Sequence, residues 1–414
     1  METSRLDLKF LLAPVGREEF FARHWEREPL VVSRGEPARY DALLGSSDLE
    51  FIVSGACRQK GAVELLGDPE GGGAGGVAPA ESAVGVLKAF RRGATVRVYG
   101  VQHFWKPVWS LCRELEQLFG CPVKANLYCT PARSQGAQLH YDTHDVLVLQ
   151  IAGRKSWRVF PPLVPLPLTH LPPLAFEEHT GLLKYQRGGP RRGRGDIREE
   201  ECGDPLRDLT LEAGDLLYLP RGFVHDARTG EETSVHLTLG VHAMTWLDLV
   251  TVALGRAANA DERFRRALPV GLNAGGNQEE LREQLAALLE AFAGQADARA
   301  ALDELTGSFV NSLQSVGEGA LTSAEAPEEF DAQALLERPA GLLCRFVDGG
   351  PTVGLASADA ALWMPAIFAP AFRFVAQTRA LRAAELPGPM SEQSKLALAR
   401  RLVQDGFLRV AEKR

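Results

Sequence analysis

The sequence predicts an α+β protein in which a β-rich region is followed by helices and then by a small mixed segment. Between residues 123 and 244, short stretches rich in valine, leucine and aromatic residues alternate with glycine, proline and polar turns. This pattern is typical of an all-β sandwich or barrel. After Met244, leucine and phenylalanine recur at three- and four-residue steps, which indicates amphipathic helices. The length of 414 residues allows two or three domains.

The composition is that of an ordinary globular protein, 45% hydrophobic and 24% charged, and it excludes wholesale disorder. A net charge of -7 argues against a protein that mainly coats nucleic acid. The six cysteines lie far apart and form no CxxC pair, which disfavours a cysteine zinc site or a disulfide framework and favours a reducing compartment. The chain has no signal-peptide pattern and no apolar run of ~18 residues, so we expect a cytoplasmic protein.

The first 120 residues are predicted to mix helix and strand. Residues 18–29 predict a helix, and residues 29–35 predict a short strand that ends at a glycine. Residues 67–80 are rich in glycine but lack a GK[ST] motif, so they predict a surface loop rather than a phosphate-binding loop. Residues 108–120 have apolar side chains at helical spacing and end at Gly120.

In the β-rich region, the alternation of apolar runs and turns predicts six strands. They are expected at residues 123–130, 145–153, 155–160, 208–214, 215–220 and 234–242. An insertion at 161–205 is first rich in proline and then basic, with six basic side chains between Lys184 and Arg198. This basic run could contact RNA, but a mobile, solvated loop is the favoured interpretation.

Four helices and a mixed C-terminal segment are predicted after the β region. The helices are expected at residues 245–257, 261–268, 278–294 and 298–314. A polar linker at 317–330 leads to strands at 343–350 and 352–357, helices at 371–386 and 391–406 and a last strand at 407–412. This order of elements is similar to a winged-helix module. Residues 331–414 carry 11 basic and 8 acidic side chains, and this net charge of +3 is weak for a duplex binder, so no direct DNA binding is expected.

Three residues of the β region form a candidate metal site. His140 and Asp142 stand two residues apart on a predicted strand, so both side chains leave the same face. His225 follows a turn that contains Pro220 and Gly222, at the end of another predicted strand. Each of these residues taken alone has an ordinary structural explanation. Together, two imidazoles and one carboxylate match the facial triad of non-haem Fe(II) oxygenases.

The other histidines are weaker candidates. On one strand His144 would lie about 13 Å from His140 at ~3.3 Å per residue, too far to share a metal ion. Strand alternation does not settle which face His236 occupies. The remaining histidines have no partner at ligand spacing and are expected to be structural: His24, His103, His170, His179 and His242.

A facial-triad iron requires a two-electron co-substrate, commonly 2-oxoglutarate, to activate O₂. The distal carboxylate of 2-oxoglutarate must be paired with a cation when it is buried, because an unpaired buried charge is costly. Lys155 would point into the barrel if Ser156 points out, and it could then supply that cation. A solvated lysine in a turn is the alternative.

Two stretches, NLYCTPARSQGAQLHYDTHDVLVLQIAGRKSWRVF (126–160) and GDLLYLPRGFVH (214–225), strongly resemble the JmjC-type ribosomal oxygenases. The resemblance implies a double-stranded β-helix (jelly-roll, cupin-like) catalytic domain at 1–244. It also implies a helical dimerisation domain at 245–325, which would make the protein a homodimer, and a C-terminal winged helix at 326–414. A helical subdomain covered only by solvent is the alternative for the second segment.

The resemblance also implies roles for individual residues. His140, Asp142 and His225 would bind Fe(II), and Lys155 would pair with the C5 carboxylate of 2-oxoglutarate. The positions expected to face the co-substrate and the target side chain are Asn126 and Tyr128, and a less secure match, Arg97, would contact the substrate; Ser134, Gln135 and Gly136 match the family's turn before the metal-binding segment. The chain departs from the family in the insertion at 161–205 and at Gly240, where the family pattern has a serine.

From these features we expect an Fe(II)- and 2-oxoglutarate-dependent dioxygenase that hydroxylates a histidyl or arginyl side chain of a ribosomal or other translation-linked protein. The lysine at position 155 and the arginine at position 97 resemble the residues of family members that hydroxylate histidine more than those that hydroxylate arginine. One alternative is an oxygenase that acts on a small molecule or peptide, although such a substrate would not require the C-terminal segments. Another is a metal-binding cupin scaffold without catalytic activity, against which the intact triad and Lys155 both count.

Overall fold

The computed structural model of the protein describes residues 6–67, 77–80, 82–168, 175–176, 183–184, 197–270, 278–313, 330–339, 341–358 and 360–411. Contacts between residues divide the chain into two compact units, Met1–Ala243 and Met244–Arg414. Most of the predicted glycine-rich loop, basic insertion and polar linker lie outside the described residues. Within the described part of the chain, no helix is long and apolar enough to cross a membrane.

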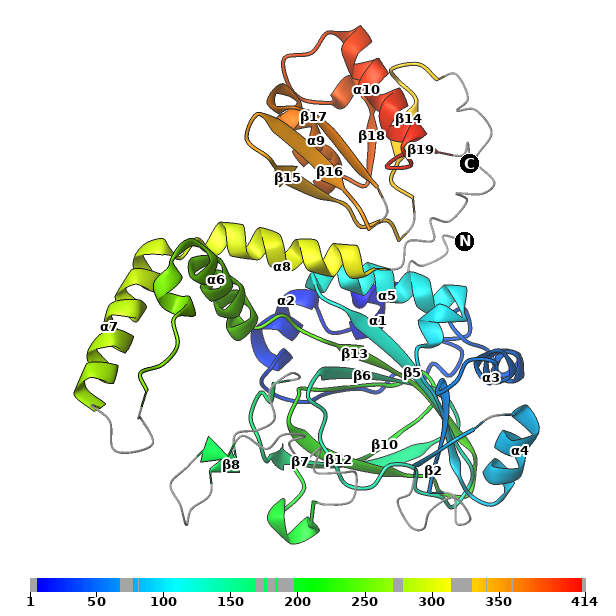
Figure 1. Ribbon diagram of the computed structural model, residues 1–414. Coiled ribbons are helices and arrows are strands. Elements are labelled where there is room, and N and C mark those ends of the chain that lie inside the picture. The colour runs from blue at the N-terminus through cyan, green and yellow to red at the C-terminus, as the bar shows by residue number, and fades with distance from the viewer. Residues whose placement is uncertain are drawn as a thin grey trace. The chain divides into compact units, whose positions relative to one another are not determined.

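The first unit contains two β-sheets that face each other (Figure 1). The larger sheet has eight strands in the order β1-β11-β6-β13-β5-β4-β2-β3, and the smaller has three in the order β10-β7-β12. The strands of the larger sheet are β1 (Leu30–Val32), β2 (Val63–Leu66), β3 (Val77–Pro79), β4 (Thr95–Val98), β5 (Val123–Thr130), β6 (Asp145–Ala152), β11 (Leu216–Leu219) and β13 (Ser234–Val241). The smaller sheet contains β7 (Lys155–Pro162), β10 (Arg207–Leu211) and β12 (Phe223–Arg228).

All the strand pairs in these sheets are antiparallel. β13 lies between β5 and β6 and is buried along its whole length, because both of its faces are covered. Between the two sheets lies a core of aliphatic and aromatic side chains: Val146, Val148, Trp157, Val159, Leu211, Leu217, Leu219, Phe223 and Ala227. This arrangement of two antiparallel sheets with a filled interior is the jelly-roll architecture expected from the sequence.

The described part of the first unit also contains five α-helices, α1 (Leu8–Leu12), α2 (Arg17–Glu19), α3 (Leu49–Ala56), α4 (Ala83–Arg91) and α5 (Lys106–Phe119). Of these, α4 and α5 pack against strands of the larger sheet. A π-helical turn, Phe20–His24, continues α2. Helix α5 packs against β5 and ends at Gly120, whose φ of 65° is the left-handed conformation that glycine adopts most easily. The helix predicted at 108–120 therefore ends where glycine predicts it.

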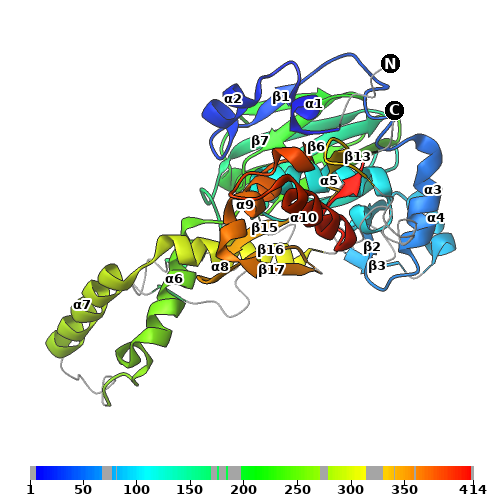
Figure 2. The same cartoon turned by 90° about the horizontal axis from the view of Figure 1, so that it is seen from above.

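The second unit begins with three helices, α6 (Trp246–Ala260), α7 (Gln278–Gln295) and α8 (Ala298–Ser312). Helix α8 packs against α6, whereas α7 projects away from the rest of this unit and has no buried residue (Figures 1 and 2). The helix predicted at 261–268 is wrong in extent, because only a 3₁₀ turn forms at Glu262–Arg265.

The C-terminal part of the second unit has its own hydrophobic core, whose buried members all lie between Phe330 and Leu408. Its elements are β14 (Leu335–Glu337), β15 (Arg345–Asp348), β16 (Thr352–Ala356), β17 (Ala361–Pro365), α9 (Ala369–Gln377), β18 (Ala380–Arg382), α10 (Glu392–Gln404) and β19 (Arg409–Val410). The helix predicted at 371–386 is too long. It ends at Gln377 because the following residues form β18, where Leu381 pairs with Leu336 of β14.

Candidate metal and co-substrate site

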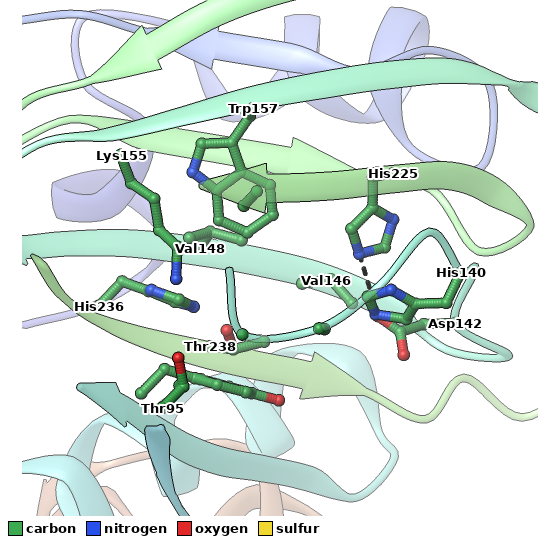
Figure 3. A pocket seen from close by; sticks show the side chains of 14 residues that line it. Thr95, His140, Asp142, Val146, Val148, Lys155, Trp157, His225, His236 and Thr238 are labelled. Atoms are coloured by element: carbon green, nitrogen blue, oxygen red, sulfur yellow. Dashed lines mark ion pairs between the residues drawn. The ribbon is translucent and has the colours of Figure 1, made fainter. Parts of the chain in front are cut away.

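The first unit brings His140, Asp142 and His225 together at one end of a cavity between the two sheets (Figure 3). One candidate ligand atom from each side chain lies within 4.8 Å of those of the other two. His225 Nε2 lies 3.7 Å from Asp142 Oδ2. Among the described residues, this is the one group of histidine, cysteine and acidic side chains with such spacing.

Three backbone hydrogen bonds hold together the segments that carry these ligands. His225 N donates to His140 O at 2.8 Å, and His140 N donates to His225 O at 3.1 Å. Gly222 N donates to Asp142 O at 2.9 Å. The turn before His225 is therefore fastened to the segment that carries the other two ligands.

Each histidine is oriented by the carbonyl oxygen two residues before it. His140 Nδ1 lies 2.7 Å from Gln138 O, and His225 Nδ1 lies 3.0 Å from Phe223 O. Because a carbonyl oxygen can only accept, each Nδ1 carries the proton and each Nε2 carries the lone pair. This tautomer makes Nε2 the metal-binding nitrogen of each ring. The donor set of two such nitrogens and one carboxylate fits Fe(II).

One sequence prediction about this site is wrong. His140 and Asp142 do not lie on a regular strand, because β6 begins only at Asp145, and His140 takes part in an isolated bridge to His225. The alternation argument therefore does not place the two side chains. Their convergence results from the hydrogen bonds to the β12 segment described above.

The other end of the cavity contains Lys155, the first residue of β7. Its side chain is buried while Ser156 is exposed, so the predicted alternation holds. Lys155 Nζ donates to Thr130 Oγ1 at 2.8 Å, and Thr95 Oγ1 donates to the same oxygen at 3.1 Å. Burial lowers the pKa of Lys155 to about 7, against a small opposing effect of Cys129.

Two further polar groups at this end are buried without a hydrogen-bond partner, Trp157 Nε1 and His236 Nδ1. Burial, and then the nearby Lys155, lower the pKa of His236 well below its usual value, so the ring is neutral. An indole N–H is a donor that costs free energy when it is buried unpaired. A carboxylate placed against Lys155 would pair its charge and could accept from an unpaired donor. This end of the cavity therefore fits the distal carboxylate of a dicarboxylic acid.

Of the other predicted site residues, Tyr128 lines the cavity and Asn126 and Arg97 do not. Tyr128 stacks on His236, with ring centroids 4.7 Å apart and an interplanar angle of 7°. Asn126 lies two residues before it on β5, and its Oδ1 accepts from Gly100 N at 3.3 Å. Arg97, opposite Tyr128 on β4, is buried, pairs with Glu64 and lies over the ring of Tyr99.

Two glycines near the site occupy positions where any larger residue would collide with a neighbouring side chain. A Cβ at Gly136 would lie 2.7 Å from Thr95 Oγ1, so the turn before His140 must have a glycine there. A Cβ at Gly240 would lie 2.6 Å from Cδ2 of the His144 ring, which stacks on His242 with centroids 4.6 Å apart. The glycine at the position of the family serine thus accommodates His144, which lies outside the triad.

Sequence reasoning missed Trp157 and Thr95, which line the cavity, and Thr130, which accepts from Lys155. Trp157 could have been found, because it lies two residues after Lys155 on the same strand and therefore on the same face. The face of His236 was left open, and the structure places its ring in the cavity. Thr95 and Thr130 carried no motif that would have marked them.

Comparison with known proteins agrees with this geometry. A family model described as "JmjC domain" matches residues 99–249, which include the triad and Lys155. Ribosomal oxygenase 1 of Gallus gallus is 32% identical over 275 residues, which cover 63% of this chain and 42% of that protein. The human protein of the same name is 33% identical over 281 residues, which cover 63% of this chain and 39% of that protein. Residues 99–249 of this chain thus match a JmjC domain, and the chain is similar to ribosomal oxygenases.

The chain is also similar in overall fold to solved structures of another protein. A crystal structure of E. coli YcfD covers 95% of this chain and 98% of its own, with a TM-score of 0.55 and 21% identity. A structure of YcfD described as a ribosomal oxygenase in complex with cobalt and 2-oxoglutarate has a TM-score of 0.53 and 20% identity. The chain spans less than half the length of the two ribosomal oxygenase 1 relatives given above.

Proposed function

We propose that this chain is an Fe(II)- and 2-oxoglutarate-dependent dioxygenase that hydroxylates a side chain of a ribosomal or other translation-linked protein. One observation carries the proposal. A facial set of metal ligands stands at one end of a cavity, and a buried lysine with unpaired polar groups stands at the other. A 2-oxo diacid has a matching layout, since its oxo-acid end can chelate a metal and its distal carboxylate can pair with a cation.

In this proposal His140, Asp142 and His225 hold Fe(II), and Lys155 anchors the co-substrate. The metal and 2-oxoglutarate would supply the activation of O₂ and the insertion of one oxygen atom into a C–H bond. The protein would supply orientation. The carbonyl groups fix both histidine tautomers, and Lys155 fixes the direction in which the diacid lies. The closely packed walls, including Trp157 and Val148, would exclude water from the reaction.

The proposed target is a histidyl or arginyl side chain. A Dictyostelium discoideum relative, 37% identical over 190 residues, is named a bifunctional lysine-specific demethylase and histidyl-hydroxylase, which favours histidine. Tyr128 would contact the target, with Asn126 and Arg97 placed beside it on the same sheet. Gly240 stands where the family pattern has a serine, and the His144 ring occupies the space that a side chain there would need.

We also propose three domains, with boundaries at 1–244, 245–325 and 326–414, and a homodimer formed through the second. Helices α6–α8 have exposed apolar side chains that a second copy would cover: Trp246, Leu247, Val250, Leu254, Leu285, Leu289 and Leu302. The separate core between Phe330 and Leu408 supports a winged-helix domain with a structural or protein-docking role. The six free thiols support a cytoplasmic location.

A turnover assay tests the proposed chemistry. Purified protein with Fe(II), ascorbate and 2-oxoglutarate should produce succinate. When ribosomes from a strain that lacks the gene are added to this mixture, one ribosomal protein should gain 16 Da, the mass of one oxygen atom. Succinate production that is stimulated by free amino acids or peptides but not by ribosomes would support the small-molecule alternative. Metal binding without succinate production would support the scaffold and contradict the proposal.

A further inference from the structure

A buried cluster of charged and polar side chains includes residues close in sequence to the metal-binding triad. Asp145 has no exposed surface, and its carboxylate accepts from Tyr218 Oη and Arg221 Nη1, each at 2.8 Å. Arg221 Nη1 also lies 2.5 Å from Glu26 Oε1. Because a buried carboxylate and guanidinium are costly to leave unpaired, these contacts strongly constrain the positions of the segments that carry them.

The cluster joins the two segments that supply the metal ligands. Asp145 lies three residues after Asp142, and Arg221 lies four residues before His225. The Asp145–Arg221 ion pair and the hydrogen bond from Gly222 N to Asp142 O therefore link the same two segments, the one that contains Asp142 and the turn before His225. Breaking the pair would free this turn to move relative to Asp142.

Residues outside the JmjC match complete the cluster. Glu26 N donates to Tyr218 Oη at 2.9 Å, and Glu26 has a φ of 59°, a conformation that non-glycine residues seldom adopt. Phe20 packs edge-on against the Tyr218 ring at 4.9 Å, and Trp25 stacks on it at 6.0 Å. The N-terminal segment thus contacts both Tyr218 and Arg221, the two residues that donate to Asp145.

We propose that Asp145, Arg221, Tyr218 and Glu26 are positioning residues that set the distance between Asp142 and His225, so that the N-terminal segment controls metal affinity. The inference rests on the proposed function only in taking the triad as the metal site. It predicts that loss of the cluster weakens metal binding even when the three ligands are intact. None of the four residues needs to contact the metal.

Co(II), whose visible absorption bands report coordination geometry, is the probe. Asp145→Asn keeps the size of the side chain but removes the charge that pairs with Arg221, and it should weaken Co(II) binding by tenfold or more and alter the absorption bands. Arg221→Lys keeps the charge and should restore most of the affinity relative to Arg221→Met. Glu26→Gln, at a side chain that is about one-third exposed, should weaken binding by a few-fold without preventing folding.

A matched control is Glu116→Gln on α5. Glu116 forms a comparably buried ion pair with Arg113 at 2.6 Å and accepts from Val123 N, but it does not line the cavity. This variant should lower the melting temperature and leave Co(II) affinity within twofold of the unaltered protein. His140→Ala gives the baseline of the Co(II) titration, the signal of a protein that has lost its metal site.

The outcomes separate this inference from the proposed function. If Asp145→Asn and Glu26→Gln bind Co(II) as tightly as the unaltered protein, with the same spectrum, the cluster only stabilises the fold and the inference is wrong. If the unaltered protein binds Co(II) and the variants are weakened, but no succinate forms with Fe(II), the inference stands and the proposed function fails. If the unaltered protein binds no Co(II), both fail.

Discussion

At the scale of single residues, the site depends on the state of a few protons. The same local device, a carbonyl oxygen two residues earlier, sets the tautomer of His140 and of His225. The proton on Lys155 is set differently, by burial away from water. Metal binding and co-substrate binding should therefore respond separately to substitution and to pH.

Loss of either triad histidine should abolish metal binding without unfolding the protein. His140→Ala and His225→Ala each leave two ligands, too few to hold a divalent ion at micromolar concentration. Isothermal titration with Co(II) should show no binding, and circular dichroism should be unchanged. His144→Ala is the control, since His144 lies outside the triad, and it should bind Co(II) normally. Full activity in either triad variant would refute the assignment.

The affinity for 2-oxoglutarate should fall as the pH rises through about 7. Lys155 attracts a carboxylate only when charged, and its pKa of about 7 means that above this pH binding must take up a proton. The dissociation constant of Mn(II)-loaded protein should rise about tenfold between pH 6 and pH 8. The Lys155→Met variant should bind 2-oxoglutarate weakly at both pH values. Any pH dependence that remains in this variant comes from groups other than Lys155 and can be subtracted. An equal pH dependence in both proteins would remove Lys155 from the co-substrate site.

Gly240→Ser should destabilise the protein through one contact. The added Cβ would lie 2.6 Å from the His144 ring and force it off His242, which at a packed position costs about 1–3 kcal/mol. Combining it with His144→Ala should remove most of that cost, so the two substitutions will be strongly non-additive in thermal melts. Additive effects would show that the His144 ring is free to move aside.

The residues of the site were predictable to different degrees. The triad and Lys155 lie in motifs that can be recognised in the sequence alone. Thr95 lines the cavity and Thr130 accepts from Lys155 only because distant strands pair, which no local pattern encodes. The position of His144 depends on the absence of a side chain at Gly240, about a hundred residues away in the sequence.

At the scale of elements, turns and strand ends decide where chemistry can occur. Strands β5, β6 and β13 agree with the expected ranges, because their apolar alternation is strong and glycine or polar residues bound them. The HxD segment was expected to be strand and is not, since its backbone is used to hold the β12 segment. The helix predicted at 371–386 fails for a similar reason, because pairing with β14 overrides local helical spacing.

The β6–β7 turn, which delivers Lys155, should tolerate no side chain at Gly153. This glycine has a φ of 63°, and a Cβ would lie 2.0 Å from Thr233 O. Gly153→Ala should lower the melting temperature by several degrees, because the turn cannot relax without moving β13. Gly230→Ala is the control, since a Cβ there meets nothing within 4 Å, and it should melt like the unaltered protein. Equal melting of both variants would contradict this account of the turn.

At the scale of the whole molecule, the arrangement of exposed apolar surface is the feature that bears on assembly. On α6 the exposed residues Trp246, Val250 and Leu254 recur at four-residue steps and form one stripe. Such a stripe on a soluble monomer is a liability, whereas in an oligomer it is an interface.

Charge placed on this stripe should therefore dissociate the proposed homodimer. Val250→Glu combined with Leu254→Glu should convert the dimer to a monomer in sedimentation velocity experiments at micromolar concentration. Phe51→Glu, at a side chain 68% exposed in the first unit, should leave the dimer intact. A monomeric unaltered protein, or a dimer that survives the double substitution, would contradict the proposed interface.

The order of strands in the larger sheet has a practical consequence for work on the isolated JmjC segment. Residues before 99 supply β1, which pairs with β11, and β4, which pairs with β5. A fragment trimmed to 99–249 would leave the main-chain amides and carbonyls of β11 and β5 without neighbours on both margins of that sheet. Unprotected margins of this kind recruit other chains, so such a fragment should precipitate or form fibrils rather than report on catalysis.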